Sequence, residues 1–265
     1  MFDSSGREIS YLRVSVTDRC NLACVYCVPE EGVEHLARES ILSFERIAAV
    51  VAAAARLGVR KVRLTGGEPL VRKGIAELVG MIARIPGIEK LGLTTNGTLL
   101  APLAASLAAA GLGSVNVSLD TLDPGRYARL TRGGRIEEAL AGIRAARSAG
   151  LPVKLNVVVL EDSTEAELEG LRSWAGELGA SVQLIARYDI HSQKLDGGKY
   201  DRPPRCGNCD RLRLLADGTL RPCLHSGLSI PVDFSDIESS ILKAVEAKPA
   251  HGGAGGDLEV GQIGG

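Results

Sequence analysis

The chain has 265 residues, of which 45% are apolar and 24% are charged, and its formal net charge is −1. A chain of this size suits one α/β barrel domain, or one domain with a small appendage. The near-zero charge and the 3% aromatic content argue against a nucleic-acid or membrane-surface binder, which needs an excess of Lys and Arg. No apolar run reaches the roughly 18 residues of a membrane span, and the N-terminus has no hydrophobic signal core, so a cytoplasmic location is expected.

Six predicted strands alternate with predicted helices along the first two-thirds of the chain. The strands are Tyr11–Thr17, Lys61–Thr65, Lys90–Thr94, Ser114–Leu119, Pro152–Val159 and Ser181–Ala186. The helices are Ser43–Leu57, Lys73–Arg84, Pro102–Ala110, Pro124–Leu130, Ile136–Ala149 and Thr164–Leu178. This alternation implies parallel pairing and right-handed crossovers. It predicts an α/β fold with a partial (β/α)6 TIM-like barrel, and a doubly wound sheet is the rival architecture.

Four of the predicted strands have one polar face. Its residues are Arg13, Ser15 and Thr17, then Lys61, Arg63 and Thr65, then Asn116, Ser118 and Asp120, and finally Lys154 and Asn156. A parallel sheet covered on both sides should be apolar throughout, so we expect the apolar face to pack on helices and the polar face to line a lumen. Because bare Arg and Lys are costly to bury, that lumen should hold water and a large, polar, anionic ligand. An antiparallel sheet with one solvated face is the alternative.

The pattern changes after the sixth predicted strand. Arg187–Arg205 has the composition of a connecting loop, and Asp217-Gly218 between two short apolar runs predicts a β-hairpin. A last helix is predicted over Ser235–Ala247, with Ser235 and Glu238 at capping-box spacing. We therefore expect a barrel domain over residues 1–190 and a small cysteine-rich hairpin and helix subdomain over 191–265.

Six cysteines fall into two tight clusters, a distribution that favours two metal sites over a disulfide framework. The first cluster, Cys20, Cys24 and Cys27, follows the first predicted strand. Three thiolates on one short loop can bind three irons of a [4Fe–4S] cube and leave the fourth iron open to a small-molecule ligand. A zinc site completed by a distant residue, or ordinary buried thiols, would give the same spacing.

The second cluster consists of Cys206, Cys209 and, after the predicted hairpin, Cys223. This layout is common to zinc and iron–sulfur sites, and the nearby His225 makes a closed Cys₃His zinc site the sharpest alternative. Arg211 and Arg213 share one face of the strand that leaves Cys209. Two guanidinium groups there could bind a base or a phosphate through forked hydrogen bonds, and a solvated hairpin face is the alternative.

A Gly66-Gly67-Glu68-Pro69 turn follows the second predicted strand, at the end where barrel active sites lie. Two glycines let a ligand approach the backbone closely, and Glu68 can accept a hydrogen bond from an ammonium group. By itself such a turn is more often purely structural.

Together, the Cys20–Cys27 loop and this turn resemble the radical S-adenosylmethionine (SAM) superfamily. The resemblance implies that Cys20, Cys24 and Cys27 ligate a [4Fe–4S] cluster that binds and reductively cleaves SAM. The residues that it assigns to this cosubstrate are Tyr26 for the adenine, Gly66, Gly67 and Glu68 for the methionine amino group, and Ser118.

Further stretches are similar to one member of that superfamily, the GTP 3′,8-cyclase family of molybdenum cofactor biosynthesis. They comprise residues 12–21, 63–70, 94–97, 115–122, 154–158 and 206–224, and the terminal Gly264-Gly265. This resemblance implies a second [4Fe–4S] cluster on Cys206, Cys209 and Cys223, with an open iron that binds the guanine of GTP. It assigns GTP binding to Arg13, Arg63, Thr94, Lys154, Arg211 and Arg213, and catalysis to Arg13, Arg211 and Arg213. The implied reaction removes hydrogen from C3′ of the ribose and joins C3′ to C8 of guanine.

The same resemblance implies an external one-electron donor and a downstream pterin-forming enzyme, allows a homodimer, and places the Gly-Gly tail in the active site. A merely disordered end is the alternative for the tail. Two other functions remain open: a related radical SAM enzyme acting on another nucleotide, small molecule or peptide, and a non-enzymatic zinc-binding module.

The sequence departs from the GTP 3′,8-cyclase pattern in four places, one of which is Ala186-Arg187-Tyr188, where the family has an acidic-aromatic-Met run. The stretch before the second cysteine cluster and the C-terminal region are both short. Gln183 stands on the sixth predicted strand where the family carries an arginine, and Arg187 is a candidate replacement for the lost charge. These departures bear on phosphate recognition and leave the cysteines untouched.

Overall fold

The computed structural model describes residues 1–187, 190–191, 194, 200 and 204–253. Its first six strands follow the predicted order: β1 Tyr11–Ser15, β2 Lys61–Thr65, β3 Lys90–Thr95, β4 Ser114–Ser118, β5 Val153–Val159 and β6 Ser181–Ala186. Neighbours among β1 to β6 all pair in parallel. The sheet runs β6-β5-β4-β3-β2-β1-β7-β8-β9, so its ends do not meet and the barrel is open. The six-unit partial barrel predicted from the sequence is confirmed.

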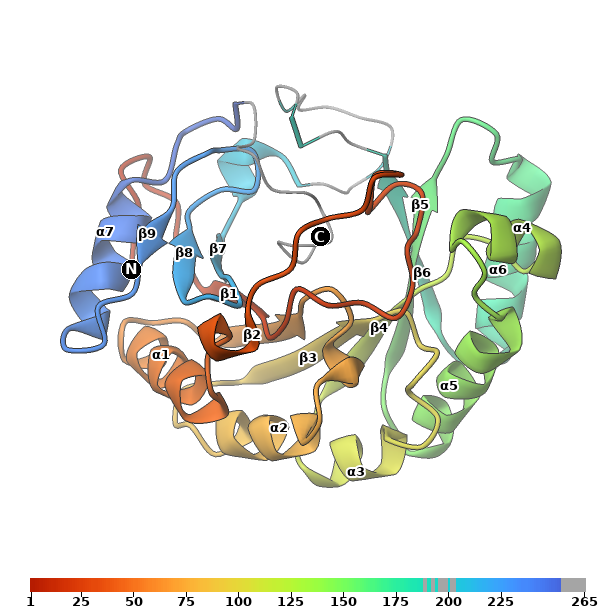
Figure 1. The fold of residues 1–265 in the computed structure, drawn as a ribbon, viewed down its shortest axis with the longest axis horizontal. Helices are drawn as coiled ribbons and strands as arrows, with labels where there is room; N and C mark the ends of the chain where they lie inside the picture. Colours follow the sequence, from red (N-terminus) through yellow and green to blue (C-terminus); the bar gives the residue numbers. More distant parts are fainter. Residues whose placement is uncertain (188–189, 192–193, 195–199, 201–203, 254–265) are drawn as a thin grey trace.

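Helices cover the convex side of this curved sheet, and its concave side faces the interior of the barrel (Figure 1). The described helices are α1 Phe44–Arg56, α2 Ile75–Ala83, α3 Ala104–Ala109, α4 Pro124–Leu130, α5 Ile136–Ser148, α6 Glu165–Glu177 and α7 Ile237–Glu246, with short 3₁₀ turns at Arg38–Ser40, Pro69–Val71 and Cys206–Asn208. Within the described residues, none of these helices has the length and apolar character needed to cross a membrane.

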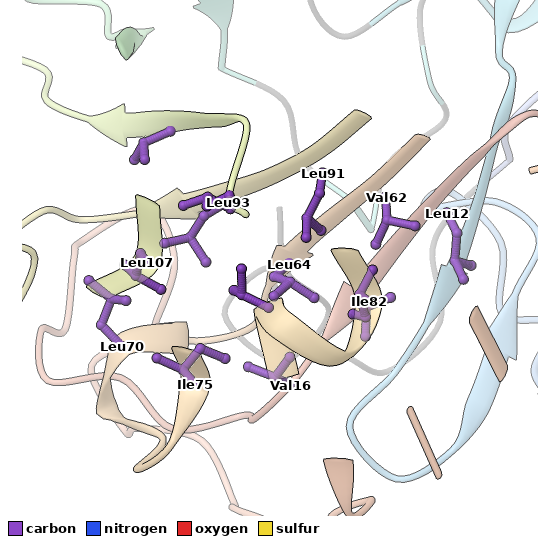
Figure 2. Packing of buried hydrophobic residues seen from close by; sticks show 14 of the residues in the cluster. Leu12, Val16, Val62, Leu64, Leu70, Ile75, Ile82, Leu91, Leu93 and Leu107 are labelled. Atoms are coloured by element: carbon purple, nitrogen blue, oxygen red, sulfur yellow. The ribbon is translucent and has the colours of Figure 1, made fainter. Parts of the chain in front are cut away.

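The hydrophobic core lies between the sheet and its helices. Leu12, Val62 and Leu64 of β1 and β2 belong to the same buried cluster as Ile75 and Ile82 of α2, and all five are at most 2% exposed (Figure 2). Strand residues two apart share a face, so the alternation that buries these side chains turns their polar neighbours into the lumen. The sheet therefore has the two predicted faces, an apolar one covered by helices and a polar one that faces the lumen.

The C-terminal hairpin extends the barrel sheet. Strand β7 (Arg211–Leu214) pairs in parallel with β1, and β8 (Thr219–Arg221) pairs antiparallel with β7 across the predicted Asp-Gly turn. A short strand that the sequence analysis did not predict, β9 (Ile230–Pro231), completes this edge. The parallel pairing of β7 with β1 brings the second cysteine cluster beside the start of the chain.

The predicted capping box at the last helix is wrong. Helix α7 begins after Asp236, whose carboxylate accepts a hydrogen bond from the Ser239 amide at 3.1 Å. The Ser235 hydroxyl instead donates to the Asp233 carboxylate at 2.6 Å. Serine and aspartate compete for the same N-cap role, and here the residue one position later takes it.

Candidate active site

The first cysteine loop leaves the carboxyl end of β1 and lies at the mouth of the barrel. A tight turn orders it, because the amides of Cys27 and Val28 both donate to the Cys24 carbonyl, at 2.9 and 3.1 Å. The loop is also tied to α4, since the Val25 amide donates to the Leu130 carbonyl at 2.9 Å. Cys20, Cys24 and Cys27 all line one cavity there.

The Gly66-Gly67 turn packs against the backbone that leads into this loop. A Cβ at Gly66 would stand 2.4 Å from the Thr17 carbonyl oxygen, and one at Gly67 would stand 2.3 Å from that of Arg19. The amides of Gly67 and Glu68 donate to the same two carbonyls, each at 2.8 Å. Glycine is thus required here because two segments of the chain approach closely, and this approach places Glu68 beside Cys20.

Glu68 is 1% exposed and joins the ends of β2 and β3. Its carboxylate accepts hydrogen bonds from the Thr95 hydroxyl at 2.7 Å and from the amides of Asn96 at 2.7 Å and Leu70 at 3.0 Å. Burial raises the pKa of Glu68 to about 7, although these hydrogen bonds act to lower it. A buried carboxylate with this pKa favours a cationic partner in the adjoining cavity.

Tyr26 and Asp120 form a second buried pair at the same mouth. The Tyr26 hydroxyl donates to one Asp120 oxygen at 2.5 Å, and the Val158 amide donates to the other at 2.7 Å. Burial raises the pKa of Asp120 to about 6, with both hydrogen bonds opposing that shift. The pair fixes the ring of Tyr26 against the cavity that also contains Ser118.

This cavity brings together every residue that the sequence analysis assigned to the first cluster and to SAM. It encloses about 1130 Å³, including the solvent at its mouth, and its lining contains Cys20, Cys24, Tyr26, Cys27, Gly66, Gly67, Glu68 and Ser118. Thr94 lines it too, and its Oγ1 is buried without a hydrogen-bond partner among the described residues. An orphaned buried hydroxyl of this kind suits a polar ligand in the cavity.

The three thiols of the first loop are poor acids in this environment. Burial, aided by the charge of Asp120, raises the pKa of Cys24 to about 12, and burial likewise raises the pKa of Cys20 and Cys27. Thiolates here need added positive charge, which a bound metal centre supplies. The donor set of three sulfurs beside a ligand-sized cavity fits a cluster with one open iron.

The second cysteine site lies where the hairpin joins β1. Cys206, Cys209 and Cys223 line one pocket together with Arg211 and Arg213. The Nζ of Lys194 donates to the Cys206 sulfur at 3.3 Å, and the Gly252 amide donates to it at 3.4 Å. Sulfur atoms that accept hydrogen bonds from a cation and from an amide suit a negatively charged thiolate or cluster.

Among the described residues, no three His, Cys, Asp or Glu side chains converge closely enough to hold one metal ion. The Cys₃His zinc alternative with His225 therefore gains no support from the geometry. A cube binds each thiolate to a different iron, so its ligands do not have to converge on one point.

A row of arginines crosses the lumen wall beside the second site. Arg213, Arg13 and Arg63 stand at one level on the neighbouring strands β7, β1 and β2. The next position in the row is Gly92, where a Cβ would stand 2.8 Å from a terminal nitrogen of Arg63. Because Gly92 has no side chain, the guanidinium group of Arg63 has room at this position. The three arginine side chains of the row carry like charges, so their proximity costs free energy through mutual repulsion.

Tyr11 lies one layer further down and contacts several of these cations. Its hydroxyl accepts a hydrogen bond from Nε of Arg63 at 3.0 Å, and its ring lies 4.2 Å from Nζ of Lys61 and 5.6 Å from Cζ of Arg211. Burial would raise the pKa of Tyr11, but the charges of Arg13, Arg63 and Lys61 outweigh burial and lower the pKa. The predicted cationic lumen is thus present at this end.

The remaining predicted substrate residues are distributed along the same wall. Lys154 is exposed and pairs in register with Asn116 on β4. Gln183, which stands where the family has an arginine, shares a cavity with Tyr11, Lys61 and Arg211. The loss of that arginine therefore affects the part of the lumen wall where the cations gather. Arg187 lines the cavity of the first site, so its charge does not substitute for an arginine at position 183. Gly264-Gly265 and part of the loop before the second cysteine site lie outside the described residues.

Several residues at the site were not assigned a role from the sequence. Asn96 supports Glu68 through its amide and donates its side chain to Asn21 at 2.9 Å. Lys61 was placed on the polar face without a role in binding. Arg7 and Lys248 contact the second cysteine site from the two ends of the chain. Only Asn96, inside the motif of residues 94–97, had a local sequence signal.

Comparison with known proteins agrees with this geometry. A family model described as the radical SAM superfamily matches residues 14–175. Two solved structures with this fold are SuiB of Streptococcus suis bound to S-adenosylmethionine and anSMEcpe with bound AdoMet, with TM-scores of 0.65 and 0.63 at 16% and 15% identity. This chain covers 60% of the first structure and 81% of the second, and 82% and 91% of its own residues take part. The chain belongs to the radical SAM superfamily, whose members are enzymes.

Curated relatives place it more narrowly. A GTP 3′,8-cyclase of Pelotomaculum thermopropionicum is 43% identical over 307 aligned positions, which cover 94% of each chain. A GTP 3′,8-cyclase of Heliobacterium modesticaldum is 41% identical, with 94% of this chain and 93% of the relative covered. Within the superfamily the chain belongs to the GTP 3′,8-cyclase family.

Proposed function

We propose that the chain is an active GTP 3′,8-cyclase, which converts GTP to 3′,8-cyclo-7,8-dihydro-GTP in molybdenum cofactor biosynthesis. The observation that carries this proposal is the row of Arg213, Arg13 and Arg63 on the lumen wall beside the second thiol triad. Three neighbouring guanidinium groups in a concave wall call for a polyanion such as a nucleoside triphosphate. The curated relatives support the choice of GTP, because they are named for that substrate at 36–43% identity.

At the first site, Cys20, Cys24 and Cys27 would hold a [4Fe–4S] cluster, which supplies the electron for reductive cleavage of SAM. Glu68 would accept the methionine ammonium, since its carboxylate is ionised above a pKa of about 7 and borders the cavity. Tyr26, fixed by Asp120 at 2.5 Å, would offer its ring or its backbone to the adenine. Ser118 and Thr94 line the same cavity, and we assign Ser118 to SAM and Thr94 to the substrate.

At the second site, Cys206, Cys209 and Cys223 would hold a further [4Fe–4S] cluster whose open iron binds the guanine. Arg211 and Arg213 share the pocket of these cysteines and would orient the nucleotide there. Arg13, Arg63 and Lys154 would bind the ribose and phosphates along the wall. Arg13, Arg211 and Arg213 are the residues that we place nearest to the reacting atoms.

A second candidate is a related radical SAM enzyme with an auxiliary cluster that acts on another nucleotide, a small molecule or a peptide. Two observations favour this second candidate. Gln183 takes the place of a cation beside Lys61 and Arg211. The alignment to the Pelotomaculum relative extends over 307 positions although this chain has 265 residues, so the relative has residues that this chain lacks.

The family context suggests partners that complete the reaction. We propose an external one-electron donor for the first cluster and an enzyme that consumes the cyclised nucleotide to form a pterin. A cytoplasmic location and a homodimer are part of the same proposal. We also propose a functional division near residue 190, with the SAM chemistry before it and the auxiliary cluster and Gly-Gly tail after it.

The test is a reaction of the anaerobically reconstituted, reduced chain with SAM and GTP, read by mass spectrometry. The proposal predicts 5′-deoxyadenosine together with a new isomer of GTP. Formation of 5′-deoxyadenosine without a GTP-derived product, combined with no saturable GTP binding by calorimetry, would favour the second candidate. About eight irons per chain are expected from two cubes, and zinc in both triads would rule out either radical enzyme.

A further inference from the structure

The second cysteine site is fastened by a buried lysine near the end of the chain. Lys248 is 3% exposed and follows helix α7, its amide donating to the Val245 carbonyl at 3.2 Å. Its Nζ donates to the carbonyl of Arg211 at 2.7 Å and to that of Pro222 at 2.6 Å. Arg211 opens β7 two residues after Cys209, and Pro222 directly precedes Cys223. One ammonium group thus holds together the two arms that carry these cysteines.

Carbonyl oxygens alone do not account for a buried ammonium. They satisfy two of its three N–H donors but leave its charge uncompensated, and an unpaired buried charge is costly. Among the described residues Lys248 forms no salt bridge. Burial lowers the pKa of Lys248, and the charges of Arg213 and Arg7 act in the same direction. Within the described part of the chain, only Cys209 and Cys223, as thiolates, act to raise it. Negative charge at the cysteine site, two residues from one bonded carbonyl and one residue from the other, therefore stabilises the ammonium form of this lysine.

Arg7 reinforces the same arrangement from the other end of the chain. Its guanidinium donates to the carbonyls of Cys206 at 2.8 Å, Pro249 at 2.7 Å and Ala250 at 3.1 Å. Asp3 orients it through a 2.6 Å ion pair in which both side chains are at most 9% exposed. The N-terminal turn is thereby bound both to the cysteine loop and to the segment that follows Lys248.

That segment covers the pocket. A Cβ at Gly252 would stand 3.5 Å from the Cys223 sulfur and 2.8 Å from Cβ of His225, and the Gly252 amide already donates to the Cys206 sulfur. The segment 248–252 therefore approaches the sulfurs of Cys206 and Cys223 through Gly252. Its first residue, Lys248, bonds the two arms that carry Cys209 and Cys223. The charge of Lys248 is held where solvent cannot screen it.

We propose that Lys248 is a positioning residue of the second cysteine site, which sets the separation of the Cys209 and Cys223 arms and offsets the negative charge of a cluster bound there. This inference rests on the proposed function, because it needs a thiolate-bound metal centre at that site. A cube held by three thiolates is anionic and becomes more so when reduced. A nearby buried cation therefore stabilises the reduced form and raises the reduction potential.

The test compares Lys248→Met with Lys243→Met, which removes an exposed lysine from helix α7, the helix that precedes Lys248. Both are made in a Cys24→Ala background, so that only the second site holds a complete triad. We expect Lys248→Met to lower the reduction potential of the remaining cluster and to speed its loss of iron to a chelator by about tenfold or more. Lys243→Met should change neither reading. Lys248→Gln retains hydrogen-bond donors without charge and should lower the potential with a smaller effect on iron loss.

A purely structural lysine would give a different pattern. An unchanged potential and an unchanged rate of iron loss in Lys248→Met would overturn the inference, even if the melting temperature fell. If Lys248→Met does not fold, the potential of Lys248→Gln decides in the same way. If the parent chain with its second triad intact binds no iron there, the proposed function fails and this inference fails with it.

Discussion

The two cysteine sites of this barrel differ in the charge that surrounds them. The first is bordered by the carboxylates of Glu68 and Asp120, whose charges disfavour thiolates there. The second is bordered by cations, among them Arg7, Lys248, Arg211 and Arg213. The barrel therefore has an anionic cavity at the first site and a cationic cavity at the second, which suits a cationic cosubstrate at the first and a polyanion at the second.

The difference also shows how each site is built. The first is assembled from the carboxyl ends of β1 to β4, where a parallel barrel gathers its loops. The second depends on contacts between the two ends of the chain, through Arg7 and Lys248. The first is a property of the barrel, whereas the second requires that the hairpin be joined to β1.

The largest effects should come from removing one cysteine at each end. Cys24→Ala is expected to abolish formation of 5′-deoxyadenosine, because the first cluster loses a ligand. Cys209→Ala should retain SAM cleavage and lose the GTP-derived product. Each variant should drop from about eight irons to about four. Loss of SAM cleavage in both variants, measured by mass spectrometry of 5′-deoxyadenosine, would contradict the separate roles of the two sites.

Next in size is the loss of charge at the cationic end. Arg213 is 4% exposed and lies in the arginine row, so Arg213→Gln should weaken GTP binding by about 2 kcal/mol, roughly thirtyfold. SAM binding should stay unchanged. Calorimetric titration of both ligands provides the measurement, and Arg84→Gln, at the exposed position that directly follows α2, is the matched control. If Arg213→Gln weakened the binding of SAM and of GTP equally, the two ligands would not bind at sites of opposite charge.

A smaller effect is expected at the anionic end. Glu68→Gln should weaken SAM binding roughly tenfold, the usual size of a hydrogen bond to a charged group. In the parent chain, lowering the pH from 8 to 6 should weaken SAM binding as well, because the pKa of Glu68 is about 7 and its carboxylate becomes protonated. Calorimetric titrations of SAM across that pH range test this assignment, because the affinity of Glu68→Gln for SAM should depend less on pH. A parallel slope in both proteins would remove Glu68 as the ammonium acceptor.

The same pKa makes a prediction for stability without ligand. The folded state binds the proton of Glu68 more tightly than the unfolded state, whose pKa lies near 4.5. The contribution of Glu68 to the free energy of unfolding is therefore largest below pH 4.5 and is lost as the pH rises toward 7. Denaturant unfolding of the ligand-free chain at several pH values should show this loss, and Glu68→Gln should reduce it.

The smallest effect concerns the Tyr26–Asp120 pair. Tyr26→Phe removes the 2.5 Å hydrogen bond and leaves that Asp120 oxygen without its donor, at a cost of about 1 kcal/mol in the free energy of unfolding. Iron content at the first site should be unchanged, because the ring remains. Denaturant unfolding measures the loss, and a stability equal to that of the parent would mean that another donor replaces the hydroxyl.

The sequence was enough to predict most of the barrel and the first site. The alternation of Leu12, Val62 and Leu64 with polar residues predicted which strand face turns inward, because a two-residue period is local. The spacing of Cys20, Cys24 and Cys27 likewise lies within one loop. These features need no knowledge of which distant segments meet.

The second site was harder to predict because its parts come from distant segments. Nothing in the local pattern indicated that β7 would pair with β1, or that Lys248 would contact the carbonyl before Cys223. The role of the Gly66-Gly67 turn was also understated: these glycines are required by contact with Thr17 and Arg19, a reason that only the packed backbone reveals.

The central claim is that a SAM-binding end and a GTP-binding end face each other across one lumen. Its most direct test is a turnover of the reduced, two-cluster chain with SAM and GTP deuterated at C3′ of the ribose. The account predicts that the deuterium appears in 5′-deoxyadenosine, since the two ligands must meet inside the barrel for the atom to pass between them. Undeuterated 5′-deoxyadenosine alongside unchanged GTP would contradict it.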